Sequence, residues 1–293
     1  MRCLTFCSVF FWSWLAGTAD STAQSEAPTQ SGNIALAEVL RAVQSHTSVS
    51  ARLRYQARLF QHTQVGSGYY WQEGTGDNLR THWEMKTQIA GKTASYVQVF
   101  DGKHLWTDRR WPSGRQVRRL DLARLESRLP IGSNALKLAA GQGGLAQMLT
   151  ALIHRFDFQQ PRPTQLGGKP AYAFVGQWRP EQLLQIWPDA ERLSESEPPV
   201  WPQQIPHHAL ILVGQNKFPY LLEQRRQSDA YLANSVTGLR PANDPLLRYE
   251  IFEVQFAMAI DPSRFTFKED VPWKDETASM LERLQAEIAP SMP

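Results

Sequence analysis

The sequence predicts an α+β protein in which a curved antiparallel β-sheet is partly covered by helices. Apolar and polar residues alternate with a period of two through the first half of the chain, with short Gly, Asp and Asn turns between the segments. Strand patterns return in the second half after two helical segments, and strands and helices do not alternate regularly. This order of elements favours an α+β fold over a parallel sheet with crossover helices.

The first residues have the pattern of a secretion signal. A basic start at Arg2 is followed by an apolar run over residues 3–16, and small residues offer cleavage after Ala19 or Ala23. The run is shorter than the roughly 20 residues that cross a bilayer, although a membrane anchor is the competing interpretation. A lipoprotein would need a cysteine where Thr18 stands. We therefore expect residues 1–23 to be a signal peptide of an exported, soluble protein.

The mature chain would carry no disulfide, because Cys3 and Cys7 both lie inside this signal. An exported protein of this kind must be held by its core alone, and about 270 residues can bury enough area in one large domain. We expect residues 24–32 to be a flexible lead-in and residues 33–289 to form one domain. The formal net charge of +3 does not argue for nucleic acid as a partner.

The first half of this domain is expected to begin with a helix and to continue as a meander of five antiparallel strands. Apolar residues lie on one side of residues 34–45, with Asn33 as the cap of the helix. Asp101-Gly102 supplies a tight turn between the last two strands. The strands are expected at residues 51–60, 68–72, 79–86 and 96–100 and from Leu105-Trp106 onward.

The second half is expected to place two helices before four further strands. The helical patterns cover residues 118–129, ended by Pro130, and residues 144–155. The strands are expected at residues 171–178, 207–213, 220–226 and 247–258. Leu210-Ile211-Leu212-Val213 is apolar on both faces, which is typical of a central, covered strand. Long excursions at residues 179–206 and 229–245 interrupt the sheet, and loops of this length are usually functional or disordered.

Three motifs occur in a fixed order: Gly66-Ser67-Gly68-Tyr69-Tyr70-Trp71, then Val99-Phe100-Asp101-Gly102-Lys103-His104-Leu105-Trp106, then Ile260-Asp261-Pro262-Ser263-Arg264-Phe265-Thr266-Phe267. Together they resemble the periplasmic outer-membrane lipoprotein carriers and their LolA-like relatives, over roughly residues 34–110 and 207–278. The resemblance implies a half-open β-barrel with helices covering the concave face, and a cavity behind them for acyl chains. It also implies a periplasmic monomer without cofactor or catalytic activity.

Two departures from that family stand in this sequence. The chain is longer than a minimal carrier, and the extra length lies in the two excursions. The carriers hold a cavity arginine just after the Gly-x-Gly strand, but Gln72-Glu73-Gly74 occupies that place here, and the nearest arginine is Arg80 on the next strand. The hydrogen bonds that latch the lid in the family therefore do not transfer to this chain.

An acyl-chain cavity would need large apolar side chains on the concave face, because each buried CH₂ group contributes about 0.8 kcal/mol. Ten tryptophans and an aromatic content of 11% fit this requirement. The candidate lining is Leu53, Tyr55, Leu59, Tyr69, Trp71, Trp83, Met85, Trp106, Phe252, Val254, Phe256 and Met258. The candidate lid residues are Leu122, Leu125, Leu129, Met148 and Leu152. The alternative is that these two sets pack against each other as an ordinary core.

An arginine-rich stretch follows Trp106. Arg109, Arg110, Arg118 and Arg119 are candidates for a basic collar that attracts anionic lipid head groups or a membrane surface, since the guanidinium fork suits phosphate. The alternative is a solvated helix face whose charge is partly neutralised by nearby carboxylates.

Catalytic and metal-binding patterns are weak in this chain. His207 and His208 are neighbours on a predicted strand, so their side chains point to opposite faces and cannot share a metal ion. Asp101 is explained as a turn residue. We therefore predict a non-enzymatic carrier of a lipid or lipidated protein, with transient contacts to a membrane surface or to membrane-bound donor and acceptor proteins. An envelope sensor or protein-interaction module on the same fold is the alternative, and an enzyme would require a buried carboxylate or histidine that faces a pocket.

Overall fold

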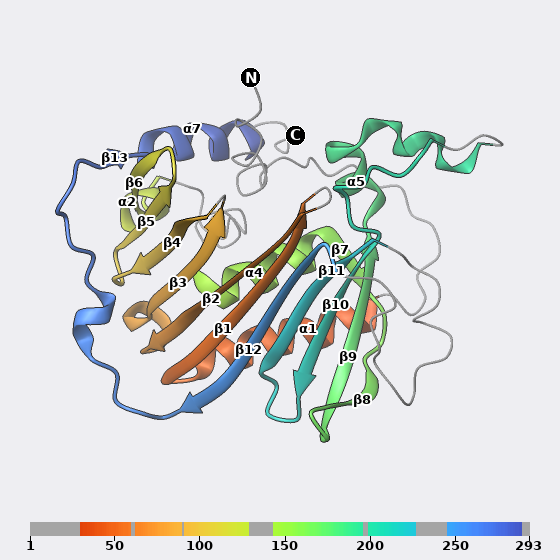
Figure 1. Cartoon of the computed structure of the whole chain (residues 1–293), viewed down its shortest axis with the longest axis horizontal. Coiled ribbons are helices and arrows are strands. Elements are labelled where there is room, and N and C mark those ends of the chain that lie inside the picture. Colours follow the sequence, from red (N-terminus) through yellow and green to blue (C-terminus); the bar gives the residue numbers. More distant parts are fainter. Residues whose placement is uncertain are drawn as a thin grey trace.

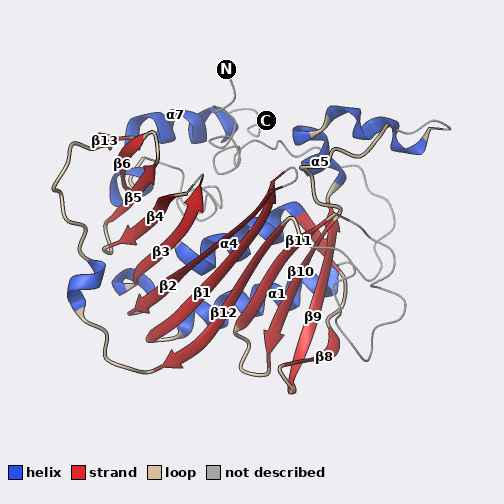
Figure 2. Cartoon of the chain, in the orientation of Figure 1, coloured by secondary structure: helices blue, strands red, loops and turns tan. Residues whose placement is uncertain are grey.

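The computed structural model describes residues 30–59, 62–89, 91–128, 143–195, 199–226 and 245–288. The predicted signal peptide, Leu129 and nearly all of the excursion at 229–245 lie outside the described residues. The predicted α+β class is confirmed: thirteen strands form one strongly curved sheet that does not close, with helices packed on it (Figures 1 and 2). In the described part of the chain, no helix is long and apolar enough to cross a membrane.

The sheet is antiparallel except where its last strand joins. The strand order is β13-β6-β5-β4-β3-β2-β1-β12-β11-β10-β9-β7, with β8 paired to β9, and only β13 runs parallel to its neighbour, β6. The strands are β1 (Ser48–Leu59), β2 (His62–Glu73), β3 (Arg80–Ile89), β4 (Lys92–Phe100), β5 (His104–Trp111), β6 (Gly114–Asp121), β7 (Phe156–Phe158), β8 (Arg162–Leu166), β9 (Lys169–Trp178), β10 (His208–Gly214), β11 (Pro219–Arg225), β12 (Leu247–Phe256) and β13 (Lys274–Asp275).

The helices lie between and after these strands. The α-helices are α1 (Gln30–Ser45), α2 (Leu122–Glu126), α4 (Gly144–Arg155), α5 (Pro180–Ile186) and α7 (Thr277–Ile288), and the 3₁₀ segments are η2 (Gly76–Asn78), η3 (Pro188–Ser194) and η4 (Pro262–Phe265). α4 has the predicted bounds, and the predicted strands are found, although β2 begins six residues before its predicted start. Strands β7, β8 and β13 were not predicted.

The predicted helix over residues 118–129 is wrong. Residues up to Asp121 belong to β6, which pairs with β5 on one side and with β13 on the other, so both of its edges are hydrogen-bonded. The helix begins only at Leu122, where the Asp121 side chain accepts a hydrogen bond from the Arg124 backbone N–H. Of the predicted helix, residues 118–121 therefore belong to a strand, and only residues 122–126 are helical.

The first helix also begins earlier than the sequence indicated. α1 starts at Gln30, inside the predicted lead-in, and Asn33 lies within the helix rather than capping it. The Asn33 side chain instead contacts strand β7, because its Oδ1 accepts from the Phe158 N–H at 3.0 Å and its Nδ2 donates to Asp157. This side chain ties α1 to the far edge of the sheet.

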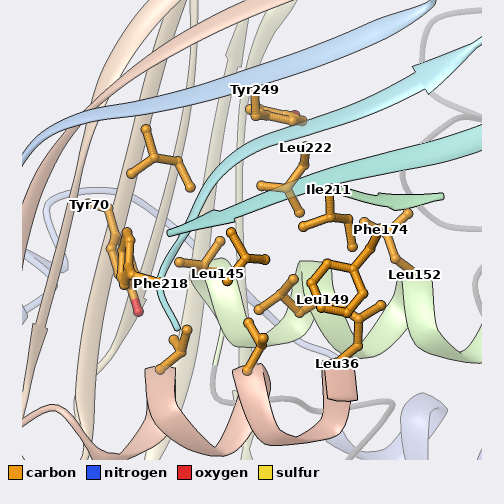
Figure 3. Packing of buried hydrophobic residues seen from close by; sticks show 14 of the residues in the cluster. Leu36, Tyr70, Leu145, Leu149, Leu152, Phe174, Ile211, Phe218, Leu222 and Tyr249 are labelled. Atoms are coloured by element: carbon orange, nitrogen blue, oxygen red, sulfur yellow. The ribbon is translucent and has the colours of Figure 1, made fainter. Parts of the chain in front are cut away.

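The helices α1 and α4 cover one face of the sheet, which we call the helix face, and the opposite side is the outer face. Leu36 of α1 and Leu149 of α4 point toward Ile211 and Leu222 of the sheet, and all four are buried (Figure 3). Leu210 and Leu212 of β10 pack on the outer face with Leu166 and Leu221, so the prediction that β10 is covered on both sides is confirmed.

The outer face carries its own cover, which we call the C-terminal strap (residues 257–276). The strap runs from the end of β12 around the outside of the first strands to β13 and α7 (Figure 1). Phe265 packs with Trp71, and Phe267 stacks on Trp106 with ring centroids 4.8 Å apart. The late D-x-x-x-F-x-F motif is thus the hydrophobic underside of this strap, with Asp261 accepting the Ser263 N–H at the start of η4.

The excursion at residues 179–206 is partly folded. Leu183 of α5, Trp187 and Ile205 form a small buried cluster, against which Trp178 and Trp201 pack. This cluster builds an arm beside the end of the sheet that contains β7 and β9 (Figure 1).

Candidate functional site

A cavity of about 530 Å³ opens on the helix face of strands β1 to β6 and β12. Residues of α1 and α4 do not contribute to its lining, so it lies beside the area that these helices fill. Its aromatic and apolar walls are Tyr55, Trp83, Met85, Ala94, Tyr96, Trp111 and Tyr249, and its polar walls are Gln64, Thr87, Ser95, Ser113, Gly114, Gln116, Arg109, Arg115 and Arg118.

Strand register brings the apolar walls together. Tyr55 of β1 pairs directly with Tyr249 of β12, and their ring centroids are 5.1 Å apart. The Trp83 ring meets Tyr249 edge-on at 5.8 Å, and Met85 of β3 pairs directly with Tyr96 of β4. Trp83 and Tyr249 also belong to the main buried cluster, so they lie between the core that the helices fill and the cavity.

The Gly-x-Gly motif lies beneath this cavity. Gly66 pairs with Tyr55 and Thr87, and Gly68 pairs with Met85, so two positions of the cavity floor have no side chain. A Cβ atom at Gly68 would lie 1.7 Å from the Glu84 carbonyl oxygen, which shows how closely β3 approaches β2. Both the hollow and the tight packing of these strands therefore need glycine here.

The opposite wall of the cavity is cationic. Arg109 of β5 is 8% exposed, and its guanidinium lies 5.7 Å from the ring centroid of Tyr96 on the neighbouring strand. Burial lowers the pKa of Arg109, and the charge of Arg118 lowers it further, whereas Tyr96 and Glu276 act in the other direction. Burial also raises the pKa of Tyr96, so the phenol remains neutral beside the guanidinium.

The other two arginines of the wall are held by carboxylates from the strap and the sheet. Arg118 Nη1 lies 3.1 Å from Glu276 Oε1. Arg115 Nη2 lies 2.8 Å from Asp108 Oδ2 and 3.1 Å from Asp270 Oδ1. The C-terminal strap thus contributes directly to the position of the cavity's cationic wall.

The predicted basic collar is divided between the two faces of the sheet. Arg109 and Arg118 line the cavity, but Arg110 and Arg119 are their neighbours along the strands and point to the outer face. Arg110 pairs with Asp108, and the Arg119 guanidinium lies 4.1 Å from the Trp273 ring centroid. The collar of four is therefore corrected to a pair, and the alternative of a solvated helix face is wrong because Arg118 and Arg119 lie on a strand.

The predicted lining residues are divided in the same way. Tyr55, Trp83 and Met85 line the cavity, whereas the helix-face residues Leu53, Val254 and Phe256 belong to the main core cluster. The residues on or beyond the outer face are Tyr69, Trp71, Trp106, Phe252 and the partly exposed Met258. Leu59 ends β1, and its side chain lies outside the described residues.

The physical reason for these corrections is strand phase. Tyr69 and Trp71 flank the buried helix-face residue Tyr70, so a period of two sends them outward. In β12 an irregularity at Glu253, which has a φ of 50°, shifts the register between Ser50 and Arg52. Phe252, before the bulge, faces outward beneath Arg52 and Arg54, while Val254 and Phe256, after it, pack in the main core cluster.

The predicted lid residues do not line this cavity. Leu122 and Leu125 pack with Met280 and Leu284 of α7, in a separate cluster at the end of the sheet. Met148 and Leu152 pack in the main core beneath the sheet. This second pair fits the alternative of an ordinary core.

Sequence reasoning missed most of the cavity lining, including the aromatic residues Tyr96, Trp111 and Tyr249. Tyr249 and Ile251 share a phase in β12, and that alternation was the available signal for Tyr249. Glu223 and His208 are buried, but neither lines the cavity, and Glu223 is paired with Arg225 and Arg248 on the outer face. The cavity lining that the structure describes contains no Asp, Glu or His.

No protein-family model and no curated protein sequence matches this chain. Solved structures that align with it include a DUF1329 family protein from Desulfovibrio piger, with 9% identity and a TM-score of 0.36 over 82% of this chain and 98% of that one. A domain described as an outer membrane lipoprotein-sorting protein from Vibrio parahaemolyticus aligns with 9% identity and a TM-score of 0.34, over 81% and 97% of the two chains. The lipoprotein LppX of Mycobacterium tuberculosis aligns with 8% identity and a TM-score of 0.36, over 79% and 99%. At such scores these alignments carry no argument about the activity of this chain, which must be inferred from its own residues.

Proposed function

We propose that this chain is an exported, periplasmic, non-enzymatic carrier that binds a lipid, or the acyl chains of a lipidated protein, in the cavity on its helix face. The observation that supports this proposal is the hollow of about 530 Å³ between aromatic and methionine side chains. Sites for small molecules typically have volumes of about 300–1,000 Å³ and mostly apolar walls with a few polar groups.

Transfer of an acyl chain from water into such a cavity is favourable without any chemical step. Each buried CH₂ group contributes about 0.8 kcal/mol, so a chain of myristoyl length gains on the order of 10 kcal/mol before the costs of ordering are subtracted. Tyr55, Trp83 and Met85 offer the surface for this burial. Release then requires a partner or membrane that offers the chain an equally apolar environment.

Native mass spectrometry tests this proposal most directly. The protein is purified from the periplasm without detergent, its mass is measured in the native state, and an organic extract is examined for lipids. We expect a bound acylated species in the native spectrum and in the extract. A protein that is free of ligand, and stays so after incubation with phospholipid and lipopeptide, would contradict the proposal.

A protein-interaction module remains the second candidate, and one observation favours it. The arm at residues 180–205 exposes Ile186, Leu193 and Val200, with Val200 91% exposed. Exposed apolar side chains grouped on one projection are typical of surfaces that bind proteins. If the cavity stays empty in the experiment above, this arm becomes the first place to seek a partner.

A further inference from the structure

We propose that the ligand is an amphiphile with an anionic head group, a phosphate or a carboxylate, which contacts Arg109 and Arg118 while its chain lies over Tyr55, Trp83 and Met85. This inference rests on the proposed function, and it names the chemical class of the ligand.

The geometry of the cavity places a cationic end next to an apolar end. Leu53, Gly68, Met85, Tyr96 and Arg109 are successive cross-strand partners in one row on the helix face. Neighbouring strands are about 4.8 Å apart, so Arg109 lies about 10 Å from Met85 across the sheet. A chain that starts at the arginines therefore reaches the apolar wall within its first several carbon atoms.

The charge of the cavity is of one sign. Its charged lining residues are Arg109, Arg115 and Arg118, and the described lining contains no carboxylate. Arg115 is the cross-strand partner of Arg110, so its guanidinium is directed toward the outer face and the cavity charge comes from Arg109 and Arg118. The carboxylates of Asp108 and Asp270 hold Arg115, and that of Glu276 holds Arg118. Arg109 is the most buried of the three; it contacts the Tyr96 ring and bonds to Tyr96, while Arg118 and Glu276 act on its pKa in opposite directions.

An anion would offset the cost of this arrangement. Burial lowers the pKa of Arg109 and the charge of Arg118 adds to this, while Tyr96 and Glu276 offset part of it; a bound oxyanion would reduce the cost that remains. The guanidinium fork also forms paired hydrogen bonds with carboxylate and phosphate oxygens, which are stronger than hydrogen bonds between neutral groups. An uncharged lipid would bury the same chain without this gain.

The test uses the full mature protein and three amphiphiles with the same twelve-carbon chain, each below its micelle concentration. The probes are dodecyl phosphate, dodecanoate and the uncharged 1-monododecanoylglycerol, and inorganic phosphate is measured separately. Affinities are measured by isothermal titration calorimetry for the wild type and for the variants Arg109→Gln, Arg109→Lys and Arg110→Gln. Arg110→Gln is the matched control, because Arg110 is the next residue of the same strand and points to the outer face. Thermal unfolding establishes that each variant is folded.

We expect both anionic probes to bind the wild type at least about tenfold more tightly than the uncharged probe, as charge-assisted hydrogen bonds predict. Arg109→Gln should abolish this preference by weakening the binding of both anionic probes at least about tenfold. Arg109→Lys should retain part of the preference, and Arg110→Gln should retain all of it.

Three results would overturn the inference. Equal affinity for charged and uncharged probes in the wild type would leave the lipid cavity in place but refute the anionic class. Inorganic phosphate that binds as tightly as dodecyl phosphate would indicate an anion site that does not use the chain. If no amphiphile binds, the proposed function fails, and this inference fails with it.

Discussion

At Gly68 the backbones of β2 and β3 lie so close that only glycine fits. A Cβ atom there would lie 1.7 Å from the Glu84 carbonyl oxygen and 2.8 Å from the Met85 sulfur. The methionine side chain can move, but the carbonyl belongs to the sheet and cannot move without breaking strand pairing. The Gly-x-Gly motif is thus explained by steric limits on this part of the sheet.

We therefore expect Gly68→Ala to lower the free energy of unfolding by about 2 kcal/mol or more, the range for overpacked sites or above it. Urea denaturation followed by circular dichroism measures the change. Ser67→Ala is the control, because Ser67 is exposed on the same strand and should change the free energy by less than about 0.5 kcal/mol. Equal stability of Gly68→Ala and the wild type would show that the strands can separate at this point.

Thr87 lines the cavity and can be used to fill it. In Thr87→Trp the indole would occupy part of the hollow between Tyr55 and Met85, and we expect the bound lipid to be lost in native mass spectrometry. Thr93→Trp introduces the same side chain on the neighbouring strand, where Thr93 is exposed and not part of the lining, so its lipid should be retained. Loss of lipid from both variants would point to general destabilisation instead of occlusion.

At the scale of elements, the C-terminal strap joins the outer face to the cavity. Trp273 meets Trp106 edge-on at 5.4 Å, and the Arg119 guanidinium lies over its ring. The same segment supplies Asp270 and Glu276 to the arginines of the cavity wall. The strap therefore stabilises the curved end of the sheet and positions the cationic wall.

Removal of the Trp273 ring should loosen the strap. We expect Trp273→Ala to increase amide hydrogen exchange over residues 262–288, because the strap loses the ring that packs edge-on against Trp106 and lies beneath Arg119. Trp187→Ala is the control, since Trp187 packs in the separate cluster of the arm and should leave exchange in the strap unchanged. Unchanged exchange in Trp273→Ala would show that β13 and α7 hold the segment without this ring.

Acid should weaken the junction between the strap and α7. Burial alone would raise the pKa of Asp275, but hydrogen bonds from Thr277 and Arg119 lower it to about 2, from 3.8 for an unperturbed aspartate. A carboxyl with a depressed folded-state pKa stabilises the fold above its unfolded pKa, and this stabilisation is lost as pH falls from 3.8 toward 2. Between pH 5 and pH 2, the free energy of unfolding should therefore fall more steeply for the wild type than for Asp275→Asn. Parallel curves for the two proteins would show that Asp275 does not contribute.

At the scale of the whole molecule, the helix face is divided into a filled part and a hollow part. α1 and α4 fill the area over β9 to β12 and over parts of β1 to β3, while the cavity lies beside them toward β4 to β6. A ligand that binds only the folded state raises the free energy of unfolding of the whole molecule. At a dodecyl phosphate concentration 100 times its dissociation constant, we expect the free energy of unfolding to rise by about 2.7 kcal/mol, and Thr87→Trp should show no rise at that concentration. A wild type that gains no stability while binding the probe would indicate binding to the unfolded chain as well.

The sequence by itself determined the α+β class, most strands, helix α4 and the turn at Asp101-Gly102, because these depend on local periodicity and turn chemistry. It also placed Tyr55, Trp83 and Met85 correctly, since strands β1 and β3 keep a regular period of two. The local pattern could not show that residues 118–121 form a strand, because it fits a helix equally well. Hydrogen bonding of β6 to β5 and β13 decides the conformation.

Only the tertiary structure decided which face each aromatic residue occupies. Trp71 and Trp106 have the large aromatic side chains expected of a cavity lining, but they lie on the outer face, where the strap covers them. The bulge at Glu253 put Phe252 out of phase with Val254 and Phe256. The row from Gly68 to Arg109 exists only because four strands are in register. Strand periodicity is local and can be read from the sequence, whereas register and the choice of face depend on contacts between residues far apart in the chain.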